Sequence, residues 1–175
     1  MTTQDELTET LRGWFTGRLP QDLFDGPPEV VVDREEITVV GRIPVPATAE
    51  GASAAEVSAA AAGRLKEFRE RTRAARMAVA AEAEHKFGRK VSWGARCGEN
   101  TELFTTLSVP VMTRLRQSER QLLDTLVQAG VARSRSAALG WCVRPVGERA
   151  EAWLGELREA VRTVEQVRDA GPDLR

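Results

Sequence analysis

The chain has 175 residues, of which 42% are hydrophobic, and a formal net charge of −1. This length suits one large domain or two small ones around a hydrophobic core. It contains no apolar run near the roughly twenty residues of a membrane helix, and its start lacks the basic and apolar parts of an export signal. Cys97 and Cys142 lie far apart, without the spacing of metal ligands. We therefore expect a globular cytoplasmic protein with no metal or other cofactor.

The first fifty residues predict a short helix and a pair of strands. Thr3 and Glu6 have the spacing of a capping box. The amphipathic helix that follows is expected to end between Gly13 and Gly17 and to bury Leu7, Leu11 and either Trp14 or Phe15. After a loop over 20–28, strands are expected over 29–32 and 37–43. The acidic residues 33–36 could resemble paired catalytic carboxylates, but their position between two strands favours an exposed turn.

A long helix is predicted over 53–87, opened by a capping box from Ser53 to Glu56 and stopped by Gly88. Its packing face is expected to hold Leu65, Phe68, Thr72, Ala75 and Val79. A neighbouring basic arc is expected to hold Lys66, Arg69, Arg73 and Arg76. These arginines could contact phosphates, or they could be solvated and paired with Glu67 and Glu70.

The next segments predict a second hairpin. A strand is expected over 89–97, followed by a turn at 98–100 and a strand beginning near Leu103. Trp93 could stack on a base. Because it lies in an alternating strand, a place in the core is the favoured interpretation.

Residues 107–115 alternate in a way that is typical of a strand. One side would bury Leu107, Val109, Val111, Thr113 and Leu115. Met112 and Arg114 would face outward together on the other side. Pro110 cannot donate a ladder hydrogen bond, so the paired part is expected to extend only from Val111 to Leu115.

Two helices joined by a turn are predicted after this strand. Ser118 and Gln121 have capping-box spacing at the start of the first helix, whose buried stripe would be Leu122, Leu123, Leu126 and Val127. Gly130 would end that helix. The segment 133–136, Arg-Ser-Arg-Ser, would cap the second helix and place guanidinium groups at its N-terminus, where an anion such as a phosphate is favoured. The second helix is expected to continue through Val143.

Together these residues resemble the ribbon-helix-helix superfamily of DNA-binding proteins (MetJ/Arc/CopG-like). The resemblance covers about forty residues and rests on Thr113-Arg-Leu115, Leu123-Asp-Thr-Leu126, and Gly130-Val131 followed by 133–139. Family members usually begin close to their strand, whereas more than a hundred residues precede it here. The resemblance implies a homodimer whose two strands form a ribbon in the major groove of double-stranded DNA. It implies base reading by Arg114 and Met112, and phosphate contacts by Arg116, Ser134, Arg135 and Ser136.

Charge is distributed unevenly along the chain. Residues 1–60 hold 4 basic and 11 acidic side chains, residues 61–96 hold 10 and 4, and residues 110–149 hold 7 and 3. Basic residues are thus concentrated in the long helix and in the ribbon-helix-helix segment. This distribution favours a polyanion site, although a solvated charged face would give the same counts.

The C-terminal part predicts one more helix. Pro145 and Gly147 are expected to break or kink the chain before a helix over 148–169. Its apolar residues Leu154, Leu157, Val161 and Val164 have heptad-like spacing and call for a partner helix. That partner could belong to the same domain, to a second subunit or to another protein.

We therefore expect an α+β protein. Region 1–105 would contain hairpins and the long basic helix, and region 106–175 would contain a dimeric ribbon-helix-helix unit and a C-terminal amphipathic helix. Signatures of enzymes, such as phosphate-binding loops, nucleophile elbows and paired-histidine motifs, are missing from the sequence, so we expect no enzyme. The predicted function is sequence-specific DNA binding in transcription regulation. The alternatives are a protein-interaction module, antitoxin-like or scaffold, and a non-specific chromosome-associated DNA binder.

Overall fold

The computed structural model describes residues 4–171, which form six helices and four strands in two compact units. Unit 1 comprises Met1–Pro110 and unit 2 comprises Val111–Arg175. The α+β class is as predicted. The expected division at 105/106 lies slightly before the observed one, because the chain after β4 stays bound to unit 1 as far as Pro110.

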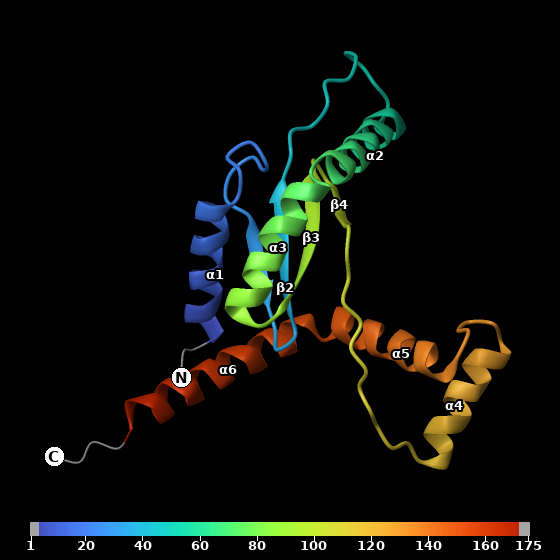
Figure 1. Cartoon of the computed structure of the whole chain (residues 1–175). Helices are drawn as coiled ribbons and strands as arrows, with labels where there is room; N and C mark the ends of the chain where they lie inside the picture. The colour runs from blue at the N-terminus through green and yellow to red at the C-terminus, as the bar shows by residue number, and fades with distance from the viewer. Residues whose placement is uncertain (1–3, 172–175) are drawn as a thin grey trace. The chain divides into compact units, whose positions relative to one another are not determined.

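Unit 1 is built on one four-stranded sheet in the order β1-β2-β3-β4 (Figure 1). The strands are β1 (Glu29–Val32), β2 (Glu36–Arg42), β3 (Lys90–Cys97) and β4 (Asn100–Leu103). The outer pairs are antiparallel, whereas β2 and β3 are parallel, with Glu36 beside Lys90. Both predicted hairpins are confirmed, but β4 ends at Leu103 instead of beginning there. The sequence did not predict that the hairpins join into one sheet.

The core of unit 1 lies on one face of this sheet. Register places Val39 beside Trp93 and Ile37 beside Val91, so their side chains share that face. Helices α1 (Gln4–Arg18), α2 (Ala54–Arg71) and α3 (Arg73–Phe87) cover it. Their buried side chains in this cluster are Leu11, Phe15, Ala61, Leu65, Phe68, Val79 and Ala83. Trp93 is therefore a core residue, as expected.

Helix α1 is longer than predicted. It continues through Gly13 and Gly17 to Arg18, because Leu11 and Phe15 are fully buried and packing outweighs the low helix propensity of glycine. The predicted cap residue Thr3 lies outside the described residues. In the β1–β2 turn, the Asp33 carboxylate accepts hydrogen bonds from the amides of Glu35 and Glu36 at 2.9 and 2.7 Å. These bonds lower the pKa of Asp33 and identify the acidic segment as a turn.

The predicted long helix is two helices that change direction at Thr72 (Figure 1). Ser53 caps α2 by accepting a hydrogen bond from the amide of Glu56 at 3.2 Å, as predicted. Thr72 is buried, as predicted, and its hydroxyl donates to the carbonyl oxygen of Phe68 at 2.6 Å. Side-chain bonding back to the preceding turn bends helices, which accounts for the break. Gly88 ends α3 with a φ of +67°, as its position predicted.

Unit 2 contains α4 (Gln117–Gln128), α5 (Arg135–Arg149) and α6 (Glu151–Ala170). Of the break or kink expected at Pro145 and Gly147, the break does not occur, because α5 passes through both residues to Arg149. Among residues 4–171, no helix combines the length and apolarity needed to cross a membrane.

Candidate nucleic-acid interface

The segment between the two units includes the predicted ribbon strand. In the single chain, residues 105–116 have no regular secondary structure. Its first part is held by unit 1: the amide of Leu107 donates to the Glu36 carboxylate at 3.0 Å, and the Ser92 hydroxyl donates to the same oxygen. The alternating run is thus divided at Pro110, and Val111–Leu115 is the part left for a ribbon.

The burial predicted from strand parity does not occur within one chain. Val111, expected to be buried, is 87% exposed, and Met112, expected to face outward, is 98% exposed. Arg114 is also exposed, and Leu115 is half-buried. A strand needs a neighbour to cover one of its faces, and the single chain offers Val111 none.

Helices α4 and α5 form the helix-turn-helix that the sequence predicted. Gly130 follows α4 with a φ of +74°, the left-handed conformation that favours glycine at this position. Ser134 caps α5 by accepting a hydrogen bond from the amide of Ala137 at 3.2 Å. The predicted cap of α4 at Ser118 is wrong by two residues, because the helix starts at Gln117 and its N-cap is Arg116. There the amide of Arg116 donates to the Glu119 carboxylate at 2.5 Å.

Unit 2 has little core of its own. Among the side chains described in residues 111–171, only Leu123 and Ala138 are buried hydrophobic residues. Of the stripe predicted on α4, Leu126 and Val127 are half-buried and Leu122 is exposed. The apolar residues of α6 are also largely exposed, Leu154 being the half-buried exception. Two buried side chains are too few to offset the conformational entropy of about sixty ordered residues.

Arg135 joins the two helices rather than projecting freely. Its Nε and Nη2 each lie 2.6 Å from one carboxylate oxygen of Asp124, in a bidentate ion pair. The hydrogen bond lowers the pKa of Asp124 and raises the pKa of Arg135. Within one chain, the guanidinium that was expected to hold a phosphate is therefore engaged by α4.

The other predicted interface residues of unit 2 are exposed. Arg116 lies at the start of α4, and Ser136 lies in the first turn of α5 next to the cap residue Ser134. Sequence reasoning missed Arg120, whose Nη1 donates to the carbonyl oxygen of Leu115 at 2.6 Å. This bond holds the end of the ribbon segment against α4. Its spacing from Leu115 gave no signal, because side-chain bonds to a non-helical carbonyl follow no sequence period.

The predicted basic arc in unit 1 is only partly a surface. Arg69 and Arg73 are exposed, but Arg76 is buried at 5% exposure, so its placement on an exposed arc is wrong. Its Nε donates to the Thr72 hydroxyl at 3.0 Å and its Nη2 to the carbonyl oxygen of Arg69 at 2.7 Å. The guanidinium of Arg76 lies 4.9 Å from the centre of the Phe104 ring, the residue that follows β4. The periodicity of a straight helix could not predict that Arg76 is buried.

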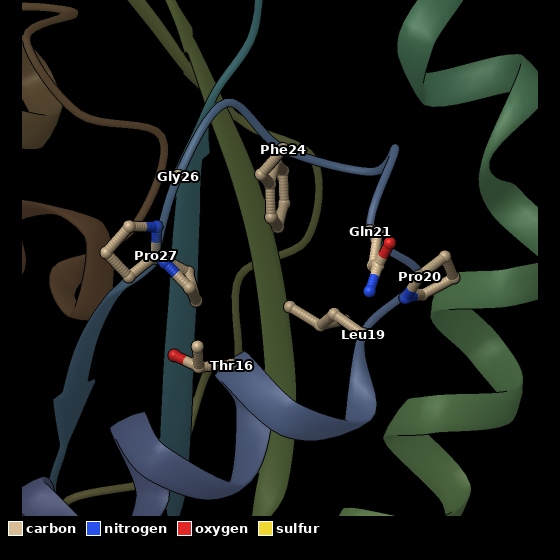
Figure 2. A pocket seen from close by; sticks show the side chains of 8 residues that line it. Thr16, Leu19, Pro20, Gln21, Phe24, Gly26 and Pro27 are labelled. Carbon is tan, nitrogen blue, oxygen red and sulfur yellow. The ribbon is translucent and has the colours of Figure 1, made fainter.

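A pocket in unit 1 lies between the end of α1 and the loop that precedes β1. It has a volume of about 280 Å³, and Figure 2 shows Leu19 and Phe24 extending toward the same space, with Thr16 and Gln21 as its polar side chains. Its lining contains no charged residue. In the part of the chain that the structure describes, no group of His, Cys, Asp and Glu side chains is arranged to hold a metal ion.

Comparison with known proteins matches the chain to two domain models. Residues 9–103 match the N-terminal domain of Rv1265-like proteins, and residues 116–168 match the Mb1296 C-terminal domain. The chain belongs to the Rv1265-like family. It is 57% identical over 161 residues to the uncharacterized proteins Rv1265 of Mycobacterium tuberculosis and Mb1296 of Mycobacterium bovis, covering 92% of this chain and 70% of each relative. No solved structure matches the chain significantly. The two domain matches leave residues 104–115 between them, the segment that contains the proposed ribbon.

Proposed function

We propose that the chain is a homodimeric, sequence-specific DNA-binding protein that acts in transcription regulation. The observation that carries the proposal is the largely exposed segment Val111–Leu115 directly before a helix pair in which, among the described side chains, only Leu123 and Ala138 are buried hydrophobic residues. A second copy would pair its own segment with this one and cover both helix pairs. This arrangement follows from the resemblance to ribbon-helix-helix proteins.

Charge and side-chain position support DNA as the ligand of this dimer. Residues 110–149 hold 7 basic and 3 acidic side chains, and Arg114 and Arg116 are exposed at the end of the ribbon segment. A two-stranded ribbon fits the major groove, where an arginine can bind guanine bidentately. In this proposal Arg114 and Met112 face base edges. Arg116, Ser134 and Ser136 face phosphates.

The test has two parts. Light scattering of the full chain should give twice 19.2 kDa. Selection of bound fragments from genomic DNA should yield a common site that unrelated duplex competes for poorly. A monomer at micromolar concentration that still binds DNA would contradict the ribbon. Equal competition by unrelated DNA would indicate a non-specific chromosome-associated binder instead.

One observation favours a second candidate, a protein-interaction module. Helix α6 exposes an apolar stripe that includes Trp153 at 60%, Val161 at 51% and Val164 at 67%. Such stripes are typical of helices that pack on a partner helix. A dimer that binds no DNA at low salt would favour this function.

A further inference from the structure

Unit 1 contains a groove that combines cationic side chains with an apolar floor. Its volume is about 540 Å³, within the range of small-molecule sites. Arg69, Arg73 and Arg76 lie at one part of its wall, and the apolar lining includes Met77, Ala80, Val91, Trp93 and Phe104. All lining residues fall within 69–105, so the groove belongs to unit 1 alone.

The charge of the groove is not balanced within the described residues. Arg76 is buried and donates to two neutral oxygens, and the structure gives it no carboxylate partner. Burial, followed by the charges of Arg69 and Arg73, lowers the pKa of Arg76, yet a guanidinium stays protonated in proteins. A buried charge without a counter-charge is costly.

The nearby carboxylates do not supply that counter-charge. Glu102 lies 3.7 Å from Arg69, and Glu84 is engaged by Lys90 at 2.6 Å. Arg73 is exposed and has no ion pair among the described residues. The cluster is therefore suited to an anion that enters from solvent and contacts Arg73 and Arg76 together.

The apolar lining of the groove indicates which chemical group the ligand carries beside its anionic group. Met77 is 58% exposed, although it lines an apolar wall together with Trp93 and Phe104. The indole N–H of Trp93 is buried and has no hydrogen-bond partner in the described chain. Because Trp93 and Phe104 are themselves buried, the uncovered apolar surface of the groove is that of Met77 and Ala81. Inorganic phosphate would leave this surface uncovered, whereas a flat apolar group would cover it.

We propose that this groove binds a small organic anion that carries its acidic group on a flat apolar body. The acidic group contacts Arg73 and Arg76, and the flat body packs against the exposed side chains of Met77 and Ala81. Charge and apolar area are both needed, so a ligand with one of them binds much more weakly. This binding does not depend on the proposed contact of unit 2 with DNA.

The probe is 1-naphthyl phosphate, titrated calorimetrically into the full chain. We expect a dissociation constant of about 1 mM or tighter, a range that its size allows. We expect binding at least tenfold weaker for inorganic phosphate, which lacks the ring, and for 1-naphthol, which lacks the charge. In NMR spectra, the indole N–H signal of Trp93 should shift with 1-naphthyl phosphate.

Matched variants locate the site. Arg73→Gln should weaken 1-naphthyl phosphate binding at least tenfold, and Met77→Ala should weaken it several-fold; both residues are exposed, so both variants should fold. Arg64→Gln removes an exposed arginine of α2 that does not line the groove and should change nothing. Failure to bind 1-naphthyl phosphate, equal binding of inorganic phosphate, or an equal loss in Arg64→Gln would overturn the proposal. Displacement by random duplex DNA would also overturn it, because the arginines would then belong to a polyanion surface.

Discussion

Arg135 and Asp124 form a bidentate ion pair that connects α4 to α5, with both nitrogen–oxygen distances at 2.6 Å. The pair fixes the first turn of α5 against α4, next to the cap residue Ser134. It therefore sets the position of the residues proposed to contact phosphate. We infer that Arg135 orients these residues, whereas the sequence predicted a direct contact of Arg135 with phosphate.

This pair predicts a pH dependence of stability. The pKa of Asp124 is lowered in the folded chain, so its stabilising effect is complete above the unfolded value of about 3.9 and is lost as pH falls through the folded value. The stability difference between the native protein and Asp124→Asn should be constant between about pH 5 and 7 and should shrink under more acidic conditions. Urea unfolding across pH measures it. If Asp124→Asn has the same effect in an Arg135→Gln background, the two residues are not coupled.

Leu123→Ala should destabilise unit 2 by about 2–5 kcal/mol, because it removes one of the two buried hydrophobic side chains described there. Thermal or urea unfolding of the full chain, monitored with a spectroscopic probe in unit 2, measures this loss of stability. Gln121→Ala, on the exposed side of α4, is the matched control and should stay within about 0.5 kcal/mol. Similar midpoints for both variants would contradict the packing described for α4.

Gly41→Ala should destabilise unit 1 by about 1–3 kcal/mol. A Cβ at this position in β2 would lie 2.1 Å from the Phe24 ring, so the loop over 20–28 would have to move. Gly63→Ala in α2 is the control, since its Cβ would meet no atom within 4 Å. That variant should be stabilised by about 0.4–1 kcal/mol through the unfolded chain. Similar free energies of unfolding for Gly41→Ala and Gly63→Ala would mean that Phe24 is not fixed against β2.

Arg114→Ala and Arg116→Ala should weaken DNA binding in different ways. If Arg114 reads a base edge, its removal should cost about 1–3 kcal/mol on the selected site and much less on scrambled duplex. If Arg116 holds a phosphate, its removal should weaken both duplexes alike and lower the slope of log affinity against log salt by about one. A salt series on both duplexes measures this. An equal loss on both DNAs for Arg114→Ala would exclude base reading.

Much of the fold could be predicted because its signals are local. Alternation placed β1, β2 and β3, and glycines with positive φ ended α3 and α4 where expected. The parallel pairing of β2 with β3 could not be predicted, since it joins residues such as Glu36 and Lys90 that are distant in sequence. Packing also carried α1 past its glycines, where local propensity predicts an end.

The candidate site was predicted in part, for a related reason. Ser134 and Gly130 cap helices as their residue types indicate. The burial of Arg76 depends on a bend at Thr72 that helical periodicity ignores. The groove depends on residues from α2, α3, β3 and the chain after β4, which no single segment displays.

The parallel pairing of β2 and β3 has a consequence for synthesis of the chain. While the ribosome has made only the first hairpin, the inner edge of β2 has no partner, because the strand that completes it ends at Cys97. Closing the intervening loop is entropically unfavourable, and this step is expected to limit the folding rate of unit 1. Nascent chains that end before Lys90 would expose the unpaired edge of β2 and should recruit chaperones. Chains extended past Leu103 should not, because β3 then covers that edge.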